Sequence, residues 1–299
     1  MESRTSKSRH EDGLDCVWPL ACELGEGPLW WRGALWFTDI KQKKVHRFDP
    51  ESGNGESWQA PSEVGFLAPL ENGHFIAGAK SGLHDFNPAT GAFRLVRAVE
   101  PEIPSNRLND GAVDSEGRLW FGSMDDLECN PSGALYRLDR GGLSLMDPGY
   151  VITNGPAISP DGRTLYHTNT LQKRIYAFDL RADSSLAGKR IFAVIEEGAG
   201  YPDGSVVDSQ GCLWTGLFGG WGARRYSPQG QLLQTVSFPV ANVTKLAFAG
   251  TDLKTVYATT ARKGLDPAAL AEQPLAGGLF RFQAETPGQP QTFAAIDFG

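Results

Sequence analysis

The sequence is poor in several features that define large protein classes. Its 299 residues include four cysteines with no C-x-x-C spacing, a pattern that fits free thiols in a reducing cytoplasm better than a disulfide. No apolar run approaches the length needed to span a bilayer. Acidic residues outnumber basic ones, giving a net charge of −7, so nucleic-acid binding is not expected. We therefore expect a cytoplasmic protein without membrane contact.

Common catalytic motifs and helical periodicity are also missing. The sequence contains no H-E-x-x-H, G-x-S-x-G or G-x-x-x-x-G-K-[ST] motif. The five histidines are scattered, and His167, on an alternating segment, is interpreted as a packed residue rather than a metal ligand. Helical spacing is limited to residues 266–273, which could form two turns. Any catalytic site must therefore be built from other residues.

Short β-rich segments bounded by tight turns fill the chain instead. Six related blocks begin at Gly27, Gly65, Gly111, Gly155, Gly204 and Lys245. Successive blocks start 38 to 49 residues apart, a period typical of a propeller blade of about four strands. The sequence therefore predicts an all-β, six-bladed β-propeller.

The repeat also suggests where the domain begins and how it closes. Residues 1–14 are polar at their start and are expected to form a disordered tail, and residues 15–299 are expected to form the propeller domain. An open sheet edge invites aggregation, so the ring should be closed by the two ends of the chain. We expect residues 15–21 (DCVWPLA) to pair with residues 292–298 (TFAAIDF).

Polar residues recur where the blocks begin. Glu26, Asn154 and Asp203 each stand directly before the first glycine of a block. Equivalent positions of the blades converge on the central channel, so these side chains are expected to meet at one of its mouths. Two carboxylates and an amide oxygen suit a hard divalent cation. The alternative is simple turn formation, since Asn-Gly and Asp-Gly pairs are common in turns, but their matching positions in the repeat favour a cation site.

Other charged residues are open to two interpretations. Arg107 precedes the third block, so its forked donors either face a substrate at the same mouth or are merely solvated. Lys245 is a weaker candidate of the same kind. Asp114, Asp161 and Asp208 lie at or beside the outer turns and are interpreted as turn caps.

Several segments in order resemble a known family. They are LGEGPLWW, RLNDGAVDSEGRLWFGSM, ITNGPAISPDGRTLYHTNT, YPDGSVVDSQGCLWTGLFGGWGARRYSPQG and VTKLAFAGTDLKTVYATTARKGL. Over residues 15–295 the chain resembles the gluconolactonase/senescence-marker-protein-30 (regucalcin-like) family, and within it bacterial sugar-acid lactonases such as xylonolactonase.

The resemblance implies specific roles for five residues. It implies one divalent cation (calcium, zinc, magnesium, manganese or iron) held by Glu26, Asn154 and Asp203, with Asp203 also activating water as the catalytic base. It implies that Arg107 and Asn109 contact the sugar hydroxyls. The stretch after residue 122 is shorter than the lid of some relatives, so no role is carried over to Glu128.

The expected function is metal-dependent hydrolysis of a xylono-, arabinono- or gluconolactone to its aldonic acid in a sugar-oxidation pathway. Two alternatives stay open: a promiscuous metal-dependent esterase or organophosphate hydrolase, and a metal-binding propeller without catalytic activity. The expected partner is a small sugar lactone, and the expected state is a monomer or a weak homodimer.

Overall fold

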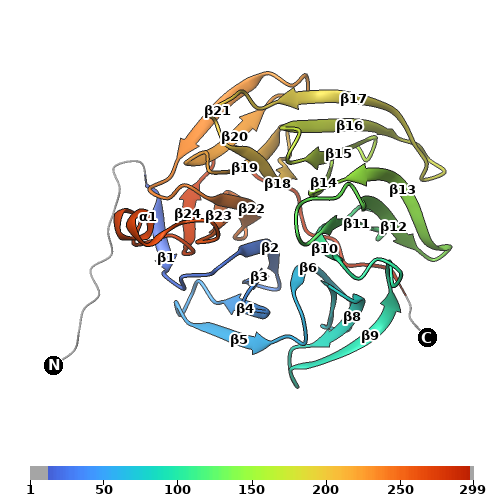
Figure 1. Cartoon of the computed structure of the whole chain (residues 1–299), viewed down its shortest axis with the longest axis horizontal. Coiled ribbons are helices and arrows are strands. Elements are labelled where there is room, and N and C mark those ends of the chain that lie inside the picture. The colour runs from blue at the N-terminus through green and yellow to red at the C-terminus, as the bar shows by residue number, and fades with distance from the viewer. Residues whose placement is uncertain (1–12, 297–299) are drawn as a thin grey trace.

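Six four-stranded antiparallel sheets surround a central axis, as the repeat predicts (Figure 1). The structure is a computed structural model that describes residues 13–296. Within each blade the strands follow chain order from the axis outward, except that blade six takes its outermost strand from the N-terminal end of the chain. The fold is therefore a six-bladed β-propeller, closed as a ring.

Each blade runs from an innermost strand at the axis to an outermost strand at the rim. From blade one to blade six, the innermost strands are β2 (Gly25–Trp31), β6 (Val64–Pro69), β10 (Asn106–Val113), β14 (Thr153–Ile158), β18 (Tyr201–Val207) and β22 (Val243–Ala249). The second strands are β3 (Ala34–Asp39), β7 (Phe75–Ala79), β11 (Leu119–Asp125), β15 (Thr164–Asn169), β19 (Leu213–Phe218) and β23 (Thr255–Thr260). The third strands are β4 (Lys44–Phe48), β8 (Gly82–Asn87), β12 (Gly133–Asp139), β16 (Arg174–Leu180), β20 (Gly222–Tyr226) and β24 (Leu279–Gln283). The outermost strands are β5 (Gly55–Gln59), β9 (Ala92–Ala98), β13 (Gly142–Tyr150), β17 (Leu186–Val194), β21 (Leu232–Ser237) and β1 (Asp15–Trp18).

The ring closes through a different strand pair from the one predicted. β1 is the outermost strand of blade six, but its partner is β24, with Asp15 opposite Arg281, and not residues 292–296; the last two residues of the predicted segment, 297 and 298, lie outside the described residues (Figure 1). The segment around residues 289–294 instead crosses the axis. Gln289 donates to the carbonyl groups of Ile158 and Val207, and the N–H of Ala294 donates to Pro69, so this segment contacts blades two, four and five.

Apolar clusters between neighbouring blades hold the ring together. One cluster packs Leu29 and Trp36 of blade one against Phe75 and Phe86 of blade two. Comparable clusters fill the other five junctions, including the one between blades six and one. Each sheet therefore buries both faces near the axis, while outermost strands such as β5 and β9 remain largely exposed.

Aspartates at the outer turns cap them, as predicted. Asp114 accepts hydrogen bonds from the N–H groups of Glu116 and Arg118 and from the indole of Trp120. Asp208 repeats this arrangement in blade five and binds the indole of Trp214. Each carboxylate thus fixes a hairpin turn and orients a core tryptophan in the second strand, which is a structural role.

The predicted helix and the predicted packed histidine are both present. The helix α1 (Pro267–Glu272) is capped by the Asp266 side chain, which accepts from the N–H of Ala269. Within residues 13–296 no helix is long and apolar enough to cross a membrane. His167 is fully buried against Tyr150, and all four cysteines are free.

The expected N-terminal tail is mostly outside the described residues. Of residues 1–14, only the last two are described, and Leu14 is buried in the apolar cluster between blades five and six.

All six innermost strands carry an irregularity at the same place. The pairing register with the second strand shifts between Glu26 and Leu29 in blade one and between Asn154 and Ala157 in blade four. Corresponding shifts occur in the other four blades. A β-bulge bends the strand and redirects the side chains beside it. The predicted site residues all lie next to these bulges.

Candidate active site

One pocket at a mouth of the channel contains all five residues predicted for the site. It has a volume of about 280 Å³ and includes Glu26, Asn154, Asp203, Arg107 and Asn109. These residues come from four innermost strands, β2, β10, β14 and β18. The remaining lining residues are Leu24, Met124, Glu128, Ile152, Thr170, Leu171, Tyr201, Phe218 and Lys263.

Glycine lets the inner strands turn beside the polar residues. Gly27 and Gly155 follow Glu26 and Asn154 and have φ angles of +57° and +73°. A Cβ atom on Gly27 would lie 2.8 Å from the carbonyl oxygen of Gly65 in the next blade. In the Glu26–Gly27 and Asn154–Gly155 pairs, a polar side chain is therefore followed by a backbone conformation that glycine adopts most readily.

Thr170 orients the amide of Asn154. The Asn154 Nδ2 atom donates to the Thr170 hydroxyl at 2.9 Å, and that hydroxyl donates to the carbonyl oxygen of Pro202 at 3.0 Å. Because the hydroxyl hydrogen is used by Pro202, Thr170 can only accept from Asn154. The amide oxygen of Asn154 is thereby turned to the other side, where it accepts from Asn109 at 3.1 Å.

The two carboxyl groups are buried and close together. Burial, followed by the charges of Asp203 and Asp110, raises the pKa of Glu26 well above its usual value. Burial and the charge of Asp110 also raise the pKa of Asp203, although a hydrogen bond with Glu26 and the charge of Lys263 oppose this. Like charges held close together in a buried site disfavour full ionisation of both groups, and a bound cation would relieve this repulsion.

This donor set fits a divalent cation. It offers two carboxylates and an amide oxygen, which are hard ligands of the kind that calcium, magnesium and manganese prefer. Within the described part of the chain, no group of three or more His, Cys, Asp or Glu side chains is arranged to hold a metal ion. The proposed set has only two carboxylates, and its third oxygen belongs to the Asn154 amide, so it is consistent with this absence. Water would complete the coordination.

Lys245 lies behind this pocket rather than in it. Its ammonium group contacts the buried Asp110 carboxylate at 2.5 Å. Asp110 also accepts from the N–H groups of Gly111 and Gly155, so it holds the backbone next to Asn154. Lys245 lines a second cavity of about 380 Å³ along the channel, which residues 289–292 border. The sequence hypothesis that Lys245 faces a substrate in the first pocket gains no support.

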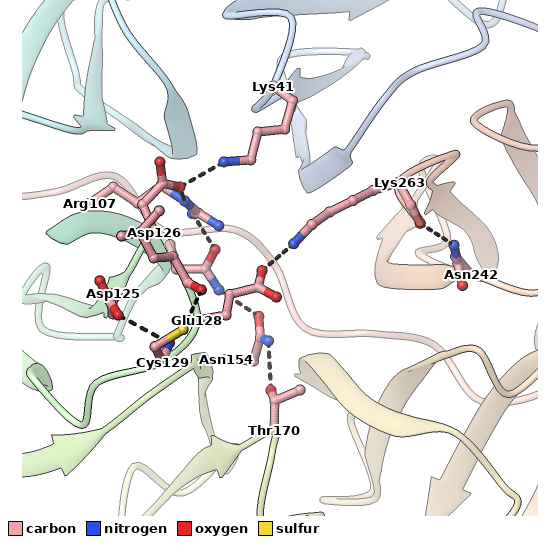
Figure 2. Close-up of polar contacts among 12 residues, drawn as sticks. Lys41, Arg107, Asp125, Asp126, Glu128, Cys129, Asn154, Thr170, Asn242 and Lys263 are labelled. Atoms are coloured by element: carbon pink, nitrogen blue, oxygen red, sulfur yellow. Dashed lines mark hydrogen bonds and ion pairs between the residues drawn. The ribbon is translucent and has the colours of Figure 1, made fainter. Parts of the chain in front are cut away.

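Arg107 is fixed by a network of charges and hydrogen bonds (Figure 2). Its Nε atom donates to Asp126 at 2.7 Å, and its Nη1 atom donates to Asn109 Oδ1 and to a backbone carbonyl. No partner for Nη2 is found among residues 13–296, so this nitrogen is the one available to a ligand. Asp126 is also bound by Lys41 and Lys80. Burial would raise the pKa of Asp126, but hydrogen bonds and charges from Lys41 and Arg107 hold it well below its usual value.

An ion pair spans the mouth of the pocket. Lys263 follows β23 of blade six, and Glu128 follows β11 of blade three, which lies across the ring. Figure 2 shows the Lys263 ammonium reaching the Glu128 carboxylate from the other side of the mouth. About a third of each side chain is exposed, so the pair stands between the pocket and solvent.

Three residues whose side chains make hydrogen bonds or ion pairs at this mouth were not predicted from the sequence: Thr170, Asp126 and Lys263. Each follows the second strand of its blade. In an antiparallel pair the end of the second strand lies beside the start of the first, so residues after the second strand surround the same mouth as Glu26 and Asp203. That rule, applied to the repeat, would have identified the segments, although not which side chains reach the pocket.

The fold and the pocket together define a six-bladed propeller with an acidic site at one mouth of its channel. Residues 24–262 match the family model described as "SMP-30/Gluconolactonase/LRE-like region". The chain therefore belongs to the SMP-30/gluconolactonase family, as its motifs suggest.

Similar proteins cover nearly the whole chain. A protein of Pseudomonas putida named 6-deoxy-6-sulfogluconolactonase is 34% identical, over 92% of this chain and 96% of its own length. An L-arabinolactonase of Azospirillum brasilense is 35% identical, over 89% and 90% of the two chains. The solved structure of a calcium-binding regucalcin from Agrobacterium tumefaciens superposes with a TM-score of 0.90 at 27% identity, over 94% of this chain and 97% of that one.

Proposed function

We propose that this protein is a metal-dependent lactonase that hydrolyses an aldonolactone, the cyclic ester of a sugar acid, to the open acid. The names of similar proteins, a sulfogluconolactonase and an arabinolactonase, support the reaction class. The proposed substrates are five- or six-carbon lactones of the xylono-, arabinono- or gluconolactone type. We place the reaction in a cytoplasmic sugar-oxidation pathway and expect a monomer or a weak homodimer.

The observation that carries the proposal is the convergence of Glu26, Asn154 and Asp203. They are separated by more than a hundred residues at the extremes, yet they line one pocket of about 280 Å³. We assign them as the ligands of one divalent cation, with its identity among calcium, zinc, magnesium, manganese and iron left to experiment. When bound, such a cation supplies Lewis-acid polarisation of an ester carbonyl.

The proposed reaction uses residues at the same pocket. Asp203 in its ionised form accepts a proton from the attacking water, for which its carboxylate must lie within hydrogen-bond reach of that water. The free Nη2 atom of Arg107 donates to a hydroxyl oxygen of the sugar. Asn109 bridges Arg107 and Asn154, so it couples the orientation of the sugar to that of the ligand amide. A second lone pair on Asn109 Oδ1 is available to a sugar hydroxyl.

Two substitutions test these roles: Asp203→Ala removes the proposed base, which is also a proposed ligand, and Glu26→Ala removes a proposed ligand alone. Asp203→Ala should reduce lactone opening to the spontaneous rate, measured by proton release from xylono- and gluconolactone. Glu26→Ala should deplete the protein of metal, measured by elemental content after reconstitution with each candidate ion. Unchanged acceleration in Asp203→Ala would remove the base from the proposal, and full metal content in Glu26→Ala would remove that ligand.

Calcium binding without catalysis is the second candidate. It is favoured by the likeness to the Agrobacterium regucalcin, which is described as a calcium-binding protein. The same panel separates the two functions, because a binding protein would take up calcium and leave every lactone at its spontaneous rate. Adding aryl esters and phosphotriesters to the panel tests the esterase alternative.

A further inference from the structure

Lys263 is anchored at its backbone, and its ammonium group is held only by an ion pair. Its N–H donates to the carbonyl oxygen of Glu23, and its own carbonyl oxygen accepts from Asn242 Nδ2 at 3.0 Å. Among the residues that the structure describes, its ammonium group has the Glu128 carboxylate as its partner. The side chain is therefore aimed over the pocket from a fixed base, with two of its three donor hydrogens unused.

Glu128 is held in position by its own turn. The Asp125 carboxylate accepts from the N–H groups of Cys129 and Asn130, and the backbone of Glu128 has a φ angle of +59°. Residues other than glycine adopt this conformation rarely, so the surrounding turn imposes it. The hydrogen bonds of the β11–β12 connection therefore fix the position of Glu128 over the pocket.

The ion pair between Lys263 and Glu128 is weak enough for another anion to replace Glu128. An ion pair exposed to solvent by about a third contributes little to stability, because water screens it and two long side chains must be ordered. An anion that enters the pocket can therefore replace Glu128 as the partner of Lys263, while Glu128 turns to solvent. A neutral sugar hydroxyl is a poorer replacement for Glu128, because its hydrogen bond to the Lys263 ammonium lacks the attraction of a negative charge.

The far side of the mouth also carries positive charge. Asp126 is shared by three cations, Lys41, Lys80 and Arg107, and Arg107 presents an unused nitrogen to the pocket. The mouth therefore has donors without matching acceptors on both sides, although the whole chain is acidic with a net charge of −7. Groups with only acceptor oxygens, such as sulfonate, phosphate or carboxylate, suit this arrangement.

We propose that the substrate is a sugar lactone bearing an anionic substituent away from the ester carbonyl, and that Lys263 is the residue that recognises this substituent. The inference rests on the proposed function and narrows its substrate class. Since Lys263 acts on a part of the substrate that does not react, its contribution should affect KM more than kcat.

The test compares one neutral lactone with its anionic counterparts. Opening of glucono-1,5-lactone is measured beside that of the 6-deoxy-6-sulfo and the 6-phospho derivatives, which separates a sulfonate from a phosphate preference. The parent protein should favour at least one anionic lactone. Lys263→Gln should lower the ratio of anionic to neutral kcat/KM by at least about tenfold, the size of one charge-assisted hydrogen bond. Lys263→Arg should restore most of it.

Lys254→Gln is the matched control. Lys254 precedes β23, at the end of the strand away from Lys263, and it is exposed. Its substitution removes the same charge from the chain, so it should leave the ratio unchanged. Glu128→Gln removes the competing carboxylate and should lower KM for the anionic lactone several-fold.

The outcomes distinguish this inference from the proposed function. The role of Lys263 is overturned if the parent protein opens the neutral lactone with the same kcat/KM as the anionic ones. It is also overturned if the ratio of anionic to neutral kcat/KM is unchanged in Lys263→Gln. Either result leaves the proposed lactonase activity intact. If no lactone is opened, the proposed function fails. Calorimetric binding of gluconate and 6-deoxy-6-sulfogluconate to the parent and to Lys263→Gln still tests Lys263, and equal affinity for both acids in both proteins overturns it.

Discussion

Replacing Thr170 by valine tests how the ligand amide is oriented. Valine has nearly the same shape as threonine but lacks the hydroxyl that accepts from Asn154 Nδ2 and donates to the carbonyl oxygen of Pro202. Thr170 is 7% exposed and Asn154 is 2% exposed, so water has little access to replace either bond. The substitution therefore frees the Asn154 amide to rotate and leaves buried polar groups without partners.

The size of the effect follows from these two bonds. Each buried hydrogen bond contributes about 1 kcal/mol net, and a buried group left unpaired adds a cost of about 1–3 kcal/mol. We expect Thr170→Val to lower the free energy of unfolding by about 2–3 kcal/mol. Groups that orient a metal ligand typically account for a factor of about 10 to 100 in metal affinity, and the same loss is expected for this substitution.

The assays are metal titration by calorimetry and thermal unfolding with a chelator present. Thr168→Val is the matched control. Thr168 lies on β15, two residues before Thr170, and is paired with Asn154 on the neighbouring strand. Its hydroxyl is buried and has no hydrogen-bond partner within the described residues. Its removal should be neutral or slightly stabilising and should leave metal affinity unchanged. If Thr170→Val binds metal as tightly as the parent, or if Thr168→Val weakens binding equally, the positioning argument is refuted.

Three further predictions concern charge and packing. Because the pKa values of Glu26 and Asp203 are raised, the folded metal-free protein keeps protons that the unfolded chain releases, so its stability should fall as pH rises from the usual carboxyl range through the raised pKa values. Thermal unfolding with chelator should show this fall in the parent and a smaller one in Asp203→Asn; equal profiles would contradict it. Lys245→Met leaves the buried Asp110 charge unpaired and should cost about 3–5 kcal/mol in urea unfolding, with partial recovery on adding Asp110→Asn. Leu14→Ala should cost about 2 kcal/mol, and no loss would mean that the cluster between blades five and six does not depend on this residue.

The repeat predicted the blades well because its signals are local. A tight turn between two β-rich segments specifies a hairpin wherever it occurs, and six such blocks in register specify a ring. The strand that closes the ring was predicted wrongly. Residues 279–283 and residues 292–298 are both short apolar segments near the end of the chain, and only the geometry of blade six selects the first as the partner of β1.

The pocket likewise contains residues that the sequence repeat identifies and residues that only the tertiary structure identifies. Glu26, Asn154 and Asp203 could be chosen from the sequence because they share a position in the repeat, and the structure brings them to one pocket. Thr170 and Lys263 carry no such signal. Their importance depends on which atoms their side chains reach, and those atoms belong to other blades or to another strand.

The sequence alone determined the number of blades, the strands within them and the polar residues placed before the glycines of three blocks, because these depend on neighbours in the chain. The tertiary structure decided which of those residues share a cavity, which hydroxyl turns the Asn154 amide, and that a lysine of blade six crosses the mouth to a glutamate of blade three. The physical reason is that bulges aim side chains and curvature sets distances between blades, and neither is encoded by any single segment.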